Sequence, residues 1–122
     1  MPVFKSLRLK SEAIVQVFQK GRAAAVSGIT LRYRFRAGGG SRFAFVVSGK
    51  VSPKSTVRNK VRRRASEWVR KNAVSFAPGF DVVFIFQKEA CSFSPHDVTR
   101  AMVAIVRKTP LVLLQHDDRT YD

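Results

Sequence analysis

A run of cations in the middle of the sequence offers the clearest chemistry. Residues 54–71 contain eight Lys or Arg and one acid, whereas a solvated helix face normally mixes both signs of charge. Arg grips a phosphate with two parallel hydrogen bonds and Lys acts as a point charge, so cations spaced i, i+4 and i+5 along a helix suit a nucleic-acid backbone. Asn59, inside this run, both donates and accepts hydrogen bonds, which suits a base edge or a 2′-hydroxyl.

Aromatic side chains next to cations form a second candidate RNA-binding feature. Tyr33 lies between Arg32 and Arg34, and Phe18 is followed by Lys20. An exposed ring stacks on an unpaired base, although the usual place of a Phe is the core. We therefore predict that Phe18 and Tyr33, alone among the aromatic residues of this region, line an open groove.

Residue patterns typical of a protein active site do not occur in the sequence. The pairs His96-Asp97 and His116-Asp117 are adjacent, so their side chains would not face each other on a helix. No nucleophile elbow, phosphate loop or His-Glu-x-x-His motif is found. Cys91 has no motif partner and is predicted to be inert. We predict no catalytic residue and no metal site made by the protein alone.

The overall charge predicts a polyanionic partner. The chain has 122 residues, 45% of them hydrophobic, and a formal net charge of +15, which fits one folded domain over residues 1–122. Self-repulsion at this charge destabilises a compact protein unless a polyanion neutralises it. Residues 1–71 carry 18 Lys or Arg and two acids, whereas residues 72–122 carry five and six, so the first part holds the binding surface.

The sequence also predicts a cytoplasmic protein without membrane association. The first ten residues lack the apolar core of a secretory signal, and no apolar run approaches the roughly 20 residues that span a bilayer. A single cysteine suits a reducing compartment.

The elements that must position these groups begin with a helix and strands. An amphipathic helix is predicted over about residues 11–20, between a serine cap and a glycine, and a short strand over 23–27. Residues 29–36 alternate between apolar and mostly basic side chains, which predicts a half-buried strand with a basic outer face. The glycine-rich turn at 37–40 leads to an alternating strand over 42–48, so these two strands are predicted to form an antiparallel hairpin.

A long amphipathic helix is predicted to carry the central cations. Ser55 or Thr56 would cap it, and it extends over about residues 56–71. Its predicted apolar face consists of Val57, Val61, Ala65, Trp68 and Val69. Its predicted polar face consists of Asn59, Arg62, Arg63, Ser66 and Arg70, with Arg58 at the boundary.

The last part of the sequence predicts a central strand and a closing helix. Residues 80–86 are apolar on both faces apart from Asp81, which indicates a strand covered on both sides. Ser94 then caps a helix that continues to about residue 108, whereas the tail 111–122 is not assigned. The element order predicts an α+β fold: a two-layer α/β sandwich of three helices on a small, mostly antiparallel sheet.

Two strings of the sequence resemble the ribonuclease P protein signature. In that signature a Ser-x-Lys strand end leads into an Arg-Asn-Arg helix that continues with Lys/Arg-Arg, and the matching strings here are Ser48–Val51 and Val57–Arg64. The resemblance covers roughly residues 7–108. The sequence departs from the pattern at Lys60, where the motif has a second Arg, and at Ile14, where the family often has Phe.

The resemblance implies a particular fold and two RNA-binding surfaces. The fold would contain a left-handed crossover into the basic helix, against the usual right-handed rule, as in the second domain of a small-subunit ribosomal protein. The catalytic RNA would contact Lys50, Arg58, Asn59, Lys60, Arg62 and Arg63. A cleft between the first helix and the sheet would hold the single-stranded 5′ leader of precursor tRNA through Phe18, Tyr33, Arg32 and Arg34.

The resemblance also implies how the work is divided between protein and RNA. The partners would be the ribonuclease P RNA and precursor tRNA, with one protein monomer per RNA. The RNA and its Mg²⁺ ions would perform the hydrolysis, the Mg²⁺ being bound mainly by the RNA, and the protein alone would be inactive. Charge and size alone equally allow a structural RNA-binding protein of the ribosomal kind, or a DNA-binding regulator with a recognition helix.

Overall fold

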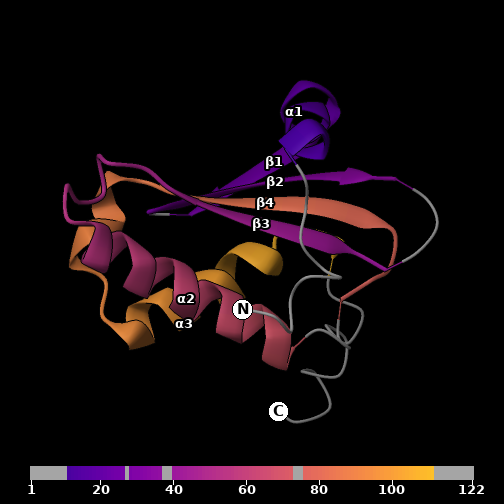
Figure 1. The fold of residues 1–122 in the computed structure, drawn as a ribbon. Helices are drawn as coiled ribbons and strands as arrows, with labels where there is room; N and C mark the ends of the chain where they lie inside the picture. The colour runs from indigo at the N-terminus through magenta and orange to yellow at the C-terminus, as the bar shows by residue number, and fades with distance from the viewer. Residues whose placement is uncertain (1–10, 27, 37–39, 73–75, 112–122) are drawn as a thin grey trace, which may run out of the picture.

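The computed structural model describes residues 11–26, 28–36, 40–72 and 76–111, which form a four-stranded sheet with helices on it (Figure 1). In chain order the elements are α1 (Ser11–Lys20), β1 (Arg22–Val26), β2 (Ile29–Phe35), β3 (Arg42–Val47), α2 (Ser55–Lys71), β4 (Phe80–Phe86), the 3₁₀ helix η3 (Lys88–Ser92) and α3 (Pro95–Val106). The predicted helices and strands all lie close to observed ones. Most of the predicted glycine turn and the tail after residue 111 lie outside the described residues.

The strand order corrects the predicted hairpin. The order is β1-β2-β4-β3, with β4 antiparallel to β2 and parallel to β3. The strands β2 and β3 run in opposite directions but do not pair, because β4 lies between them. The composition of β4 explains its place, since its side chains are buried on both faces and only a central strand is covered on both. The hairpin signal is local and cannot reveal a better partner that comes later in the chain.

The two faces of the sheet are covered by different helices. The helices α2 and α3 pack on one face, where the core includes Leu31, Phe84 and Ile105. The helix α1 packs on the opposite face, where Val17 contacts Val83, as Figure 1 shows. The predicted α+β class, with three helices and a mostly antiparallel sheet, is confirmed. Within the described ranges no helix is long and apolar enough to cross a lipid bilayer.

The basic helix lies in a crossover between parallel neighbours. Because β3 and β4 are adjacent and parallel, the chain must return along the sheet between them, and α2 makes this return. The first turn of α2 therefore follows the end of β3, while its last turn precedes the start of β4. The crossover presents the full length of α2 along one side of the molecule (Figure 1).

The closing helix begins with the predicted cap. The Ser94 Oγ accepts a hydrogen bond from the Asp97 N–H at 3.1 Å, and Asp97 Oδ2 accepts one from the Ser94 N–H at 2.9 Å. This backbone hydrogen bond from Ser94 is the main reason that the pKa of Asp97 is lowered. The cap fixes the start of α3, whose buried Met102 and Ile105 then complete the core below the sheet.

Candidate nucleic-acid interface

The outward face of α2 carries the cations that the sequence analysis placed there. The apolar positions Val61, Ala65 and Val69 are buried against α3 and β3, which orients the helix. Among the described Lys and Arg side chains of residues 54–71, the exposed ones are Lys54, Lys60, Arg63, Arg64, Arg70 and Lys71. None of these six forms an ion pair with a described acid. We call this set, together with Asn59 and Arg62, the α2 basic face.

Two residues of the α2 basic face, both predicted to contact the catalytic RNA, form a hydrogen bond with each other. Arg62 Nη1 donates a hydrogen bond to Asn59 Oδ1 at 2.7 Å. The bond uses the amide oxygen of Asn59 and leaves its NH₂ group able to donate to a ligand. It also restrains the long Arg62 side chain, which lowers the conformational entropy that binding would otherwise cost.

Arg58 links the start of α2 to the segment before it through a hydrogen bond. Its Nη1 donates a hydrogen bond to the Ser52 carbonyl at 2.8 Å, and the side chain is half-buried. Lys50 lies exposed in the turn just before, where the Lys50 N–H donates to Ser48 Oγ at 3.2 Å. The Arg58 contact therefore holds the segment that carries Lys50 against the first turn of α2.

The first turn of α2 differs from the prediction. Neither Ser55 nor Thr56 caps the helix, because the helix begins at Ser55 and its N-cap is Lys54, which makes no side-chain capping bond. No acidic residue lies in this turn. Free N–H groups at a helix start attract phosphate, so the uncapped turn extends the positive surface toward Lys50.

Ser66 does not lie on the charged face as predicted. It is 8% exposed, and its Oγ donates to the Arg63 carbonyl at 3.0 Å. The buried arc of α2 is wider than the apolar stripe suggests, because the helix packs on both α3 and β3.

Trp68, predicted to anchor the apolar face, is half-buried and meets Phe76 edge to face at 6.0 Å between ring centroids.

Phe18 and Arg32 form a second surface, between α1 and the sheet. The Arg32 guanidinium lies over the Phe18 ring, 5.4 Å from its centroid, and Arg32 Nη2 donates to the Phe18 carbonyl at 2.7 Å. Phe18 is 42% exposed and Arg32 is half-buried, so part of the ring is accessible to a ligand beside the cation. Arg32 Nε is buried without a hydrogen-bond partner among the described residues. An aromatic ring beside a cation suits a stacked base and its phosphate.

Gly21 sets how closely α1 approaches β2. Its N–H donates to the Val17 carbonyl at 2.8 Å. A Cβ at this position would lie 2.5 Å from the Val17 oxygen and 2.7 Å from the Tyr33 oxygen, both of which are backbone atoms. Only glycine fits this contact, and the close approach lets Phe18 meet Arg32.

The structure does not bring Tyr33 to the surface formed by Phe18. Successive side chains of a strand alternate between faces, and on β2 it is Arg32 that faces α1. Tyr33 lies on the face of α2 and α3, where it is half-buried and meets Phe80 edge to face at 6.1 Å. The four predicted leader-binding residues therefore divide between the two faces of the sheet. Phe18 and Arg32 lie on the α1 side together with Arg34, which is near the edge of the sheet, and Tyr33 lies on the side of α2 and α3.

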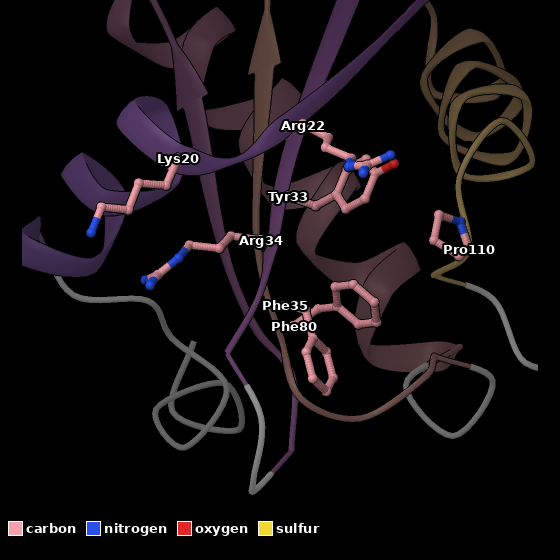
Figure 2. Close-up of a pocket in the computed structure, with 7 residues that line it drawn as sticks. All are labelled: Lys20, Arg22, Tyr33, Arg34, Phe35, Phe80 and Pro110. Atoms are coloured by element: carbon pink, nitrogen blue, oxygen red, sulfur yellow. The ribbon is translucent and has the colours of Figure 1, made fainter.

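A pocket of about 440 Å³ lies at this edge, where β1 begins and β2 continues (Figure 2). Its rings come from Tyr33, Phe35, Phe80 and Pro110, and its cations from Lys20, Arg22 and Arg34. In Figure 2, Lys20 and Arg34 lie on the α1 side of the strands, whereas the rings and Arg22 lie on the other.

The sequence analysis named three of the seven residues that line this pocket and missed the other four, which are Arg22, Phe35, Phe80 and Pro110. Phe35 was assigned to the buried face of its strand, yet it is 61% exposed, because β1 starts opposite Tyr33 and leaves the end of β2 uncovered. Arg22 and Phe80 gave no separate signal, since the pocket depends on the pairing of β1, β2 and β4. The sequence indicated the uncovered end of β2 only through strand length, since β1 is shorter than β2.

Comparisons with known proteins agree on one family. The family model described as Ribonuclease P matches residues 1–110. The Ribonuclease P protein component of Thermoanaerobacter sp. (strain X514) is 30% identical over 102 residues, which are 84% of this chain and 87% of that protein. The one from Synechocystis sp. (strain ATCC 27184 / PCC 6803 / Kazusa) is 40% identical over 83 residues, which are 66% of this chain and 67% of that protein.

Solved structures show the same fold. The RNase P protein of Staphylococcus aureus superposes with a TM-score of 0.81 at 18% identity, covering 88% of this chain and 99% of that one. The RNase P protein of Thermotoga maritima gives a TM-score of 0.71 at 25% identity, covering 80% and 92%.

Proposed function

Because the chain belongs to the ribonuclease P protein family, we propose that it binds a ribonuclease P RNA and helps it to remove the 5′ leader from precursor tRNA. The α2 basic face carries this proposal: its six exposed cations form no ion pair with the described acids, and the burial of Val61, Ala65 and Val69 holds them in a fixed array. The family match favours this function over a structural ribosomal protein or a DNA-binding regulator.

The α2 basic face is proposed to bind the catalytic RNA. Cations on a rigid helix neutralise several phosphates at once and release the counterions that the phosphates had condensed. The NH₂ group of Asn59 is free to donate to a 2′-hydroxyl or a base edge, because its oxygen accepts from Arg62. Lys50 would extend this surface past the uncapped first turn of the helix.

Phe18 and Arg32 are proposed to hold the single-stranded leader. An unpaired base can stack on the exposed part of the Phe18 ring, and the Arg32 guanidinium beside it can pair with the adjoining phosphate. Since α1 and α2 cover opposite faces of the sheet, the leader and the catalytic RNA would lie on different sides of one small protein.

The chemistry is proposed to belong to the RNA and its Mg²⁺ ions. Protein residues that hold Mg²⁺ supply carboxylate oxygens. Asp81, the buried carboxylate, already pairs with Arg36 and Arg42, and among the described residues no three His, Cys, Asp or Glu side chains cluster. The described residues of the protein therefore do not fit a Mg²⁺ site. We propose one protein monomer per RNA, inactive alone, in the cytoplasm.

Reconstitution tests the proposal. The full chain would be added to a ribonuclease P RNA acting on precursor tRNA over a range of Mg²⁺ concentrations. We expect cleavage at a lower Mg²⁺ concentration and tighter substrate binding with the protein present, and no cleavage by the protein alone. Unchanged cleavage and unchanged affinity at low Mg²⁺ would refute the proposed function.

A further inference from the structure

We propose that the pocket at the end of β2 binds a nucleotide of the same 5′ leader, with its base stacked on Phe35 and its phosphate beside Arg22. The inference rests on the proposed function and adds a second leader contact to that of Phe18 and Arg32. It gives a role to Arg22 and Phe35, which lie on the opposite face of the sheet from α1.

The stacking surface is an exposed ring that is held in place from beneath. Phe35 is the most exposed of the large apolar side chains in the described part of the chain, at 61%. It meets Phe80 edge to face at 5.3 Å between centroids. Its ring also covers Gly79, which has a φ of +89° and where an added Cβ would lie 2.9 Å from the ring. A ring fixed by such contacts can stack on a base without losing further conformational freedom.

The charges around this ring suit an anion. Lys20, Arg22 and Arg34 are among the residues that line the pocket, with Arg22 beside the rings and the other two on the α1 side of the strands, and its described lining contains no acid. The rings and cations together match a nucleotide, which combines an aromatic base with a phosphate, better than they match a purely apolar ligand. The volume of about 440 Å³ lies in the range of small-ligand sites.

The backbone of β2 offers a further donor at the same place. The Arg36 N–H donates to the Gly79 carbonyl on the β4 side. Since these groups alternate along an antiparallel strand, the Phe35 N–H and C=O point to the opposite, β1 side. The β1 pairing ends at Arg22 opposite Tyr33, so β1 does not reach them. The Phe35 N–H thus faces the edge of the pocket, where it can donate a hydrogen bond to the RNA backbone whatever the base sequence.

The pocket also lies on a continuous path from the first leader contact. Arg32 and Arg34 are two residues apart on β2, which corresponds to about 7 Å along a strand. Lys20 is the last residue of α1, and both Lys20 and Arg34 line the pocket. A single strand that stacks on Phe18 can therefore pass Lys20 and Arg34 and turn around the uncovered end of β2.

Leader length provides the test. Holoenzyme assembled from the full chain and a ribonuclease P RNA would be titrated with two precursor tRNAs, one with a leader of about ten nucleotides and one with a leader of about two. We expect Phe35→Ala to weaken binding of the long-leader precursor about tenfold, the size of one lost stacking contact, and to leave the short-leader precursor unaffected. Arg22→Ala should show the same selectivity, and Phe35→Tyr should bind as the wild type does.

Matched controls separate the possible outcomes. Arg100→Ala removes the same charge from the exposed side of α3 and should change neither affinity. If Phe35→Ala and Arg22→Ala bind the long leader like the wild type while Phe18→Ala still weakens it, the pocket proposal fails and the proposed function stands. Equal weakening of both precursors by Phe35→Ala would also overturn the pocket proposal. A wild-type holoenzyme indifferent to the leader would instead refute leader binding as a whole.

Discussion

Arg36 Nε lies 2.8 Å from Asp81 Oδ1, and this ion pair joins the end of β2 to the start of β4. Arg42, the first residue of β3, holds the same carboxylate with Nε to Oδ1 and Nη2 to Oδ2, both at 3.1 Å. Asp81 is 2% exposed. One buried carboxylate thus links the central strand to both of its neighbours.

Replacing Asp81 should destabilise the fold. Asp81→Ala removes the anion that two arginines share and leaves their charges uncompensated near the core, which costs about 3 kcal/mol of unfolding free energy. Urea denaturation followed by circular dichroism measures it. Glu89→Ala, which removes an exposed carboxylate from η3, should cost far less. Equal losses in the two variants would show that the Asp81 network does not stabilise the sheet.

Removing cations from the α2 basic face should weaken RNA binding without unfolding the protein. Lys60→Ala with Arg63→Ala takes away two exposed charges, so the slope of log affinity against log salt should fall by about 2. Dissociation constants for a ribonuclease P RNA across a salt series measure this slope. Arg100→Ala serves as the charge control. A double variant with the wild-type slope would place the RNA elsewhere on the protein.

Phe18 should contribute to leader binding through its ring. Phe18→Ala removes a stacking surface and should weaken binding of a precursor with a leader by about 1–3 kcal/mol, with no effect on mature tRNA. Phe18→Tyr keeps the ring and should bind normally. Dissociation constants of both RNAs for the holoenzyme measure this effect. A Phe18→Ala variant that also loses affinity for mature tRNA would contradict a leader-specific role.

Gly21→Ala should displace α1. The new methyl would meet the backbone oxygens of Val17 and Tyr33 at 2.5 and 2.7 Å, so helix and strand must separate. We expect a loss of about 1–3 kcal/mol in stability, as for other overpacked sites, together with weaker leader binding. Gly49→Ala is the control, because a Cβ there meets no atom within 4 Å. Thermal unfolding of the two variants should therefore differ, and identical midpoints would contradict the close contact.

The cap of α3 should make stability depend on pH in the acid range. The pKa of Asp97 in the folded protein is lowered below its usual 3.8, mainly by the backbone hydrogen bond from Ser94. A lowered folded-state pKa means that the stabilisation is complete above the unfolded pKa and is lost as the pH falls through the folded one. The stability difference between wild type and Asp97→Ala should thus be constant near neutrality and shrink as the pH falls below the usual pKa of 3.8. A difference independent of pH would exclude this ionised cap.

The sequence predicted those features that depend on local chemistry. Ser94, Pro95 and Asp97 indicated the start of α3 because capping needs only neighbouring residues. The period of the apolar residues indicated α1 and α2, and the apolar run of β4, interrupted only by Asp81, indicated a central strand. The signature around Arg58–Arg64 predicted the family, and the family match confirms it.

Features that depend on long-range pairing were not predictable. The Gly-rich turn favoured a hairpin, but β4 takes the place between β2 and β3. The alternation of side chains separated the two faces of β2 but did not show which face α1 would cover. Tyr33 was therefore predicted to lie beside Phe18, whereas in the structure Arg32 lies beside Phe18 and Tyr33 meets Phe80. Ser66 is buried because α2 contacts two elements at once, which no single helical stripe encodes.

The position of β4 also bears on synthesis of the chain. It is translated after β2, β3 and α2, yet it is the strand that joins β3 to the rest of the sheet. Until Phe80 and the residues after it have left the ribosome, β3 has no strand to pair with. The segment made by then includes residues 1–71, which carry 18 of the 23 Lys and Arg residues. The most basic part of the nascent chain is therefore exposed to cellular RNA before the strand that completes its fold has been made.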